Sequence, residues 1–184
     1  MLRTRRTAPF RITARYRTIT PLVVRGTGRA PWGCCGKLEP ATAAKHRLYQ
    51  RYLDAWWPIL LQTNQRTQYA FPRVTLLDAF AGPGRYEGKE PGSPVFILDR
   101  LLNHHAVERM NPSRSRVHLV FIERDPARYA HLVSELVAIF GPLEDLPVRV
   151  EVRRGEAGKD SLPILTELGA WAIQSWGSST AGAA

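Results

Sequence analysis

The sequence predicts an α/β fold: a partial, doubly wound parallel sheet preceded by a helix. Three segments are short runs of mostly apolar or alternating residues, as in strands, and each is followed by a segment with helical spacing of its apolar residues. Strands separated by helices favour parallel pairing through right-handed crossovers. The first strand ends in an aspartate and a glycine-rich loop, at the edge where open parallel sheets bind their ligands.

The positive charge of the chain is concentrated near its N-terminus. The 184 residues are enough for one domain with its own core, and 44% apolar and 23% charged residues are ordinary for a globular protein. Residues 1–30 contain eight arginines and no acidic residue, so they carry most of the formal net charge of +10. We expect a disordered basic arm here. It could contact nucleic-acid phosphates, act as an organelle transit peptide, or have no function.

A loop and a long helix are predicted to follow, and together they form the N-terminal unit of residues 31–66. The stretch "APWGCCGKLEP" is rich in glycine and proline and is typical of a loop. Apolar residues then recur every three or four positions through residues 42–61, which predicts an amphipathic helix with Thr42 as its N-cap. Pro58 is expected to kink this helix or to start a new turn.

Residues 67–170 are predicted to form the sheet and its helices. The strands are expected in "RVTLLDAF" (73–80), "RVHLVFIERD" (116–125) and "PVRVEVRRGEA" (147–157). The helix after the first strand is predicted to begin with Ser93 as N-cap and Pro94 behind it, and to end in a solvated turn at "HH".

Clear signals also mark the two later helices. Asp125 is the predicted N-cap of the second, which Gly141 should end, and "DSLPILTEL" predicts a short third helix. Complete doubly wound domains have about five to seven strands. The three found here predict either a small sheet or an incomplete domain. Residues 171–184 are small and polar, and we expect a disordered tail.

Several classes of protein are disfavoured by what the sequence lacks. No stretch approaches the ~20 apolar residues of a membrane-spanning helix, which predicts no membrane association. Cys34 and Cys35 are adjacent and cannot build a disulfide framework or a four-cysteine zinc site. The five histidines show no metal-ligand spacing. A cytoplasmic protein without a structural metal is therefore expected.

The glycine-rich loop "DAFAGPGRYEGKE" matches neither common phosphate-binding motif. A Walker A loop requires four residues between its glycines and a Ser or Thr after its lysine, whereas Lys89 is followed by Glu90. A dinucleotide fingerprint starting at Gly82 would require glycine where Glu87 stands. A site for S-adenosylmethionine (SAM), which holds a cationic amino acid and a ribose rather than a pyrophosphate, is the remaining hypothesis.

The residues predicted to bind SAM lie at the ends of the three strands. Asp78 would hold the loop or bind the ammonium group, and the loop glycines would let the backbone approach the ligand. Glu123, at the end of the second strand, would bind the ribose hydroxyls. Glu156, with Asp160 as the alternative, would reach the adenine. The predicted set is Asp78, Phe80, Ala81, Gly82, Gly84, Glu123 and Glu156.

Together these residues resemble the three-Cys-motif partner protein (TcmP) family over roughly residues 31–170. The resemblance is carried by "KLEPATAAKHRLYQRYLDAWWPILLQ", "LLDAFAGPGRYEGKEPGSPVFIL" and "HLVFIERDPARYAHLVSEL". The second segment is the most specific, since it joins FAGPG, the tyrosine Tyr86 and a downstream GSP. "DAFAG.G" is also similar to the first motif of DNA cytosine methyltransferases, but no Pro-Cys pair follows it.

The resemblance implies a Rossmann-like, SAM-dependent methyltransferase fold, encoded beside a partner protein that carries a three-cysteine motif. Family members continue into a fourth strand that ends in a segment like Asp-Pro-Phe-Gly, at the position expected for catalysis. Here Leu168 is followed by "GAWAIQSWGSSTAGAA". The resemblance therefore implies a C-terminally truncated member that binds SAM, with catalytic residues unknown and activity lost if the missing strand is needed.

Two functions outside catalysis stay open from the sequence. The first is a non-catalytic partner that uses the helix at residues 42–61, in which Tyr52, Trp56 and Trp57 lie close together. The competing expectation is that these rings pack the helix on the sheet. The second is a nucleic-acid-binding accessory protein that uses the basic arm, although the arm offers few aromatic residues for base stacking.

Overall fold

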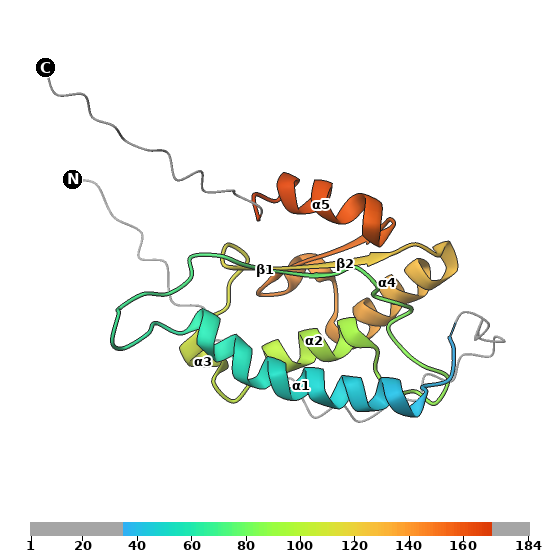
Figure 1. The fold of residues 1–184 in the computed structure, drawn as a ribbon, viewed down its shortest axis with the longest axis horizontal. Coiled ribbons are helices and arrows are strands. Elements are labelled where there is room, and N and C mark those ends of the chain that lie inside the picture. The colour runs from blue at the N-terminus through green and yellow to red at the C-terminus, as the bar shows by residue number, and fades with distance from the viewer. Residues whose placement is uncertain (1–34, 171–184) are drawn as a thin grey trace, which may run out of the picture.

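The computed structural model describes residues 35–170. The segments expected to form the basic arm (1–30) and the tail (171–184) lie outside this range, as does Cys34. Figure 1 shows a single sheet seen nearly edge-on, with helices α1, α2 and α4 below it and helix α5 above it. No helix among the described residues is both long enough and apolar enough to cross a membrane.

The sheet consists of three parallel strands in the order β1–β2–β3, namely β1 (Val74–Asp78), β2 (Val117–Glu123) and β3 (Arg149–Arg154). The central strand β2 is buried along its whole length, because it is paired on both edges and covered on both faces. The predicted mixed α/β architecture with an open parallel sheet is confirmed at this level.

Helix α1 (Pro40–Leu61) is the N-terminal helix predicted from the apolar spacing. The prediction of Thr42 as its N-cap is wrong. The N-cap is Glu39, three residues earlier, because Pro40 lies at the first helical position, where its missing N–H leaves no helix bond unmade. It also continues through Pro58, whose carbonyl accepts a hydrogen bond from the backbone N–H of Gln62.

Helix α2 (Ser93–Leu102) differs from its prediction at both ends. Gly92, not Ser93, occupies the N-cap position, and the Ser93 hydroxyl donates instead to Asp78. The histidine pair after the helix is not fully solvated: His104 is buried, with its Nε2 2.9 Å from the carbonyl oxygen of Asp54 in α1. Both differences arise because a partner distant in sequence binds the side chain.

The remaining helices are α3 (Val107–Met110), the 3-10 helix η2 (Leu143–Asp145), α4 (Pro126–Phe140) and α5 (Ala157–Glu167). The caps predicted for α4 are confirmed. Asp125 accepts a hydrogen bond from the backbone N–H of Arg128 at 2.8 Å, and Gly141 ends the helix with φ of 84°. Helix α5 begins three residues before the predicted segment and runs through Pro163.

The two faces of the sheet are covered unequally. The larger apolar cluster lies on the face of the sheet that α1, α2 and α4 cover, and the Trp57 side chain is fully buried in it. On the other face, the buried apolar cluster consists of Val120 and Ile122 of β2 and Ile164 of α5. Polar side chains of β2 and β3 also lie on that face, namely His118, Glu151 and Arg153.

These polar side chains form a network that ties α5 to the sheet. Nε2 of the buried His118 lies 3.0 Å from Oε1 of Glu151 on the neighbouring strand. The Arg153 guanidinium donates to Glu151 at 2.7 Å and to Glu167, the last residue of α5, at 2.7 Å. Burial lowers the pKa of His118, although the Glu151 carboxylate opposes this, so the imidazole is neutral near pH 7.

We expect the free energy of unfolding to fall as the pH is lowered from about 7.5 to about 5.5. In the unfolded chain His118 takes up a proton near its ordinary pKa of 6.5, whereas the folded state resists protonation. His46, whose pKa burial also lowers, contributes in the same direction. Each histidine adds a slope of at most about 1.4 kcal/mol per pH unit.

Urea denaturation of the full chain at a series of pH values measures this slope. His118→Gln keeps a hydrogen-bonding group beside Glu151. It should reduce the slope of unfolding free energy against pH to the part that His46 contributes. A slope that is the same in the variant and the natural chain would contradict this role of His118.

Candidate functional site

The candidate site lies where β1 and β2 end side by side. In the parallel register Asp78, the last residue of β1, pairs with Phe121, and Glu123 ends β2 two residues later. The structure therefore places both predicted carboxylates at the same edge of the sheet. This is the carboxyl edge, where ligands of open parallel sheets bind.

Glu123 joins the first strand's loop to the second strand's helix. Its side chain is buried, with 8% of the residue exposed. One carboxylate oxygen accepts from the backbone N–H of Gly82 at 2.9 Å, and the other accepts from that of Asp125 at 2.8 Å. A buried carboxylate needs such bonds to offset its loss of hydration. Glu123 makes no ion pair with another described residue, so its negative charge is not neutralised there.

Asp78 fixes the other side of the same loop. Its Oδ1 accepts from the backbone N–H of Phe80 at 3.1 Å, and its Oδ2 accepts from the Ser93 hydroxyl at 2.5 Å. The residue thus connects the end of β1 both to the loop and to the first residue of α2. Like Glu123, it has no cationic partner within residues 35–170.

The loop between β1 and α2 needs glycine at defined points. Gly82 and Gly84 have φ of 68° and 85°, in the left-handed region that other residues avoid. Gly92 serves close approach, because a Cβ there would lie 2.9 Å from the carbonyl carbon of Gly84. The Gly92 N–H donates to the Gly84 carbonyl at 2.7 Å and closes the loop.

The two residues before Gly82 have opposite surroundings. Ala81 is buried, and its N–H donates to the Ile122 carbonyl at 3.0 Å, which anchors the loop to β2. Phe80 is 84% exposed at the rim of the site. The Phe80 ring is therefore accessible to solvent at the carboxyl edge of the sheet.

Glu156 lies at the same edge of the sheet, but its carboxylate pairs with an arginine. It directly precedes α5 and follows the end of β3. Its carboxylate is 3.7 Å from the guanidinium of Arg124, and both side chains are largely exposed. Asp160, the alternative third acid, instead accepts from the backbone N–H of Glu156 at 2.7 Å and satisfies the start of α5.

Two residues not predicted from the sequence lie close to Asp78. The His46 ring of α1 is 5.6 Å from the Tyr86 ring of the loop and 5.0 Å from that of Phe96 in α2. Burial lowers the pKa of His46, against the opposing effect of the Asp78 carboxylate. Burial raises the pKa of Tyr86, and Asp78 raises it further.

The sequence gives no signal for His46, because its place in an amphipathic helix does not say which loop it faces. Tyr86 lies in the sequence segment "FAGPGRY", but the sequence assigned it no binding role. The charge of the Asp78 carboxylate acts on the pKa of both side chains.

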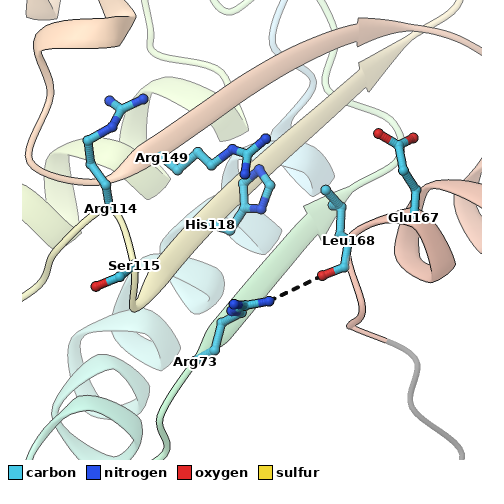
Figure 2. A pocket seen from close by; sticks show the side chains of 7 residues that line it. All are labelled: Arg73, Arg114, Ser115, His118, Arg149, Glu167 and Leu168. Carbon is cyan, nitrogen blue, oxygen red and sulfur yellow. Dashed lines mark hydrogen bonds between the residues drawn. The ribbon is translucent and has the colours of Figure 1, made fainter.

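A cavity of about 370 Å³ lies at the opposite, amino ends of the strands (Figure 2). It is lined by Arg73, Arg114, Ser115, His118, Arg149, Glu167 and Leu168. Its cationic groups already have partners: Arg114 donates to the carbonyls of Leu143, Glu144, Leu146 and Val148, and Arg149 lies 2.7 Å from Glu151. These bonds connect loops to the sheet, so we place the candidate site at the glycine loop.

The structure shows a mixed α/β fold with an open parallel sheet, in which the loop after the first strand is bonded to an acid from the second strand. No family model, curated protein or solved structure matches the chain. The choice of this edge as the candidate site therefore depends on the arrangement of the strands, the glycine loop and Glu123.

Gly84→Ala should lower the free energy of unfolding by about 1–2 kcal/mol. An alanine there must adopt a positive φ, and its Cβ would lie 3.0 Å from Cδ1 of Leu132 in α4. The matched control is Gly158→Ala in α5, where a Cβ meets no atom within 4 Å. This change should be neutral or stabilising by up to about 1 kcal/mol. Chemical denaturation of both variants measures the difference, and equal effects would contradict the loop geometry described above.

Proposed function

We propose that this chain is a SAM-binding protein with a Rossmann-like, methyltransferase-type fold, similar to the TcmP family. The observation that carries the proposal is the Glu123 carboxylate, which is buried, unpaired with any described cation and bonded to the glycine loop. An acid in this position at the end of the second strand is suited to bind the hydroxyl groups of a ribose.

The donor set fits SAM at its ribose end. A carboxylate offers about four lone-pair positions, and two of those on Glu123 are taken by backbone N–H groups. The two that remain match the two hydroxyl donors of a ribose. At Gly82 a Cβ would meet no atom of residues 35–170 within 4 Å, so none of the described side chains fills the space beside this glycine. The Gly82 N–H already donates to Glu123. Gly82 would therefore contribute space for the ligand and no hydrogen bond to it.

The fit extends to the cationic and aromatic parts of SAM. Asp78 is a carboxylate without a cationic partner in the described chain, and it would attract the ammonium group of the amino-acid end. His46 adds no opposing charge near pH 7, because its pKa is lowered. Phe80, exposed at the rim, offers an apolar ring face against which adenine can stack.

When bound, SAM supplies an activated methyl group for transfer to a nucleophile. In this proposal the residues of the chain bind and orient it: Glu123 the ribose, Asp78 the amino-acid end, and Phe80 the base. Transfer then depends mainly on proximity and orientation. The proposal assigns binding roles to these three residues and assigns no residue to the transfer itself.

Glu123→Gln should weaken SAM binding by about tenfold or more. The amide replaces one acceptor by an NH₂ group, which removes both the negative charge and a bond to the loop. The matched control is Glu144→Gln in η2, whose exposed side chain makes no hydrogen bond or ion pair among the described residues. Isothermal titration calorimetry with SAM on the full chain gives the affinities, and thermal unfolding shows that both variants are folded.

A third variant, Glu156→Gln, tests the third predicted acid separately. Its exposure and its contact with Arg124 lead us to expect a change in affinity of less than about threefold. Absence of SAM binding by the natural chain, or equal affinities for the Glu123 and Glu144 variants, would refute the proposed function.

A further inference from the structure

Helix α1 is apolar on two opposite sides. Its inner side buries Leu53, Trp57 and Leu61 in the main core. On the outer side Leu48, Tyr52 and Ile59 are 69%, 55% and 69% exposed. A helix at the surface of a protein normally presents polar residues to solvent, and one that is apolar on all sides is normally covered. The outer side of α1 therefore has the composition of a covered surface.

The outer residues form one straight row. Leu48, Tyr52, Ala55 and Ile59 follow each other at intervals of four, three and four residues, the spacing of a helix–helix seam. The Tyr52 ring is held in place, because it stacks on Trp56 with 5.9 Å between ring centroids and 26° between planes. A ring that is already held by its neighbour loses little conformational freedom when a partner docks.

The border of this row is positively charged. Lys45, Arg47 and Arg51 are exposed, and none of them makes an ion pair or hydrogen bond with another described residue. The single acidic residue within α1 is Asp54, and it faces the Arg100 guanidinium of α2 at 3.4 Å. The three cations outnumber this one carboxylate, which is already paired, so the outer side of α1 is positively charged.

This charge distinguishes between the possible occupants. The chain's own residues 1–30 contain eight arginines and no acid, so they are repelled by the outer side of α1. A second copy docking in parallel through the same row would bring like charges together, and one docking antiparallel would offer three cations a single acid, Asp54. An anionic membrane would attract the cations, but helices that lie on membranes have a polar face rich in Lys and Arg, whereas α1 carries no Lys or Arg after Arg51.

We propose that the outer side of α1 is a docking surface for an amphipathic helix of a partner protein, with acidic residues bordering the partner's apolar row. The apolar row supplies the contact area, and Lys45, Arg47 and Arg51 select an acidic partner. The inference is independent of SAM binding, since these side chains lie on the opposite side of α1 from its buried residues.

A pair of fluorescent helical peptides tests the proposal on the full chain. Both carry leucine at heptad positions a and d, and one carries glutamate and the other lysine at e and g. Fluorescence anisotropy should show that the glutamate peptide binds at least about tenfold more tightly than the lysine peptide, with an advantage that shrinks as salt is added. Leu48→Ser should weaken this binding, whereas the control Leu162→Ser, at an exposed leucine of α5, should leave it unchanged.

Charge reversal separates selective docking from general adhesion of apolar surfaces. In the Arg47→Glu, Arg51→Glu double variant the preference should invert, so that the lysine peptide binds more tightly. Equal binding of the two peptides, or binding of neither at about 1 mM, the weak limit of specific association, would overturn the proposal.

Three further outcomes would assign the surface to another occupant and also overturn the proposal. The first is a dimer in light scattering that Leu48→Ser abolishes. The second is sedimentation with phosphatidylserine vesicles that the same change abolishes. The third is displacement of the glutamate peptide by a synthetic peptide of residues 1–30.

Discussion

Glu123 is hydrogen-bonded to the segments that follow all three strands. Its carboxylate accepts from Gly82 in the loop after β1 and from Asp125 at the start of α4, and its carbonyl accepts from Gly155 after β3 at 3.1 Å. A buried carboxylate is costly unless it is bonded in this way, so the loop and the helix must adopt the positions that satisfy it. The same requirement leaves the charge of Glu123 available at the edge where a ligand would lie.

The layers of the fold follow from how each helix disposes of its apolar residues. Helices α1, α2 and α4 bury theirs in one large cluster under the sheet, whereas α5 contributes Ile164 to a small cluster above it. The rest of the upper face is held by the His118–Glu151–Arg153–Glu167 network, in which each charge has a partner. Only one side of α1 packs against the rest of this cluster, and the apolar residues on its other side, Leu48, Tyr52 and Ile59, remain exposed.

Features set by neighbouring residues could be predicted from the sequence. The strands are found because a buried strand is a short apolar run whatever it pairs with, and the cap at Asp125 is found because its partner is three residues away. The predictions at Ser93 and His104 are wrong for the converse reason. Their side chains bond to Asp78 and to the Asp54 carbonyl, groups 15 and 50 residues away, and these partners outweigh the local preference for a cap or for solvent.

By itself the sequence determined the order of strands and helices, the positions of the loop glycines, and the placing of one acid at the end of each of the first two strands. Only the tertiary structure decided that Glu123 bonds to Gly82 across 41 residues, that Glu156 faces Arg124, and that His46 and Tyr86 lie beside Asp78. It also decided which aromatic residues of α1 enter the core. Helical and strand periodicities arise from contacts a few residues apart, whereas these pairings exist only once parallel strands have aligned distant segments.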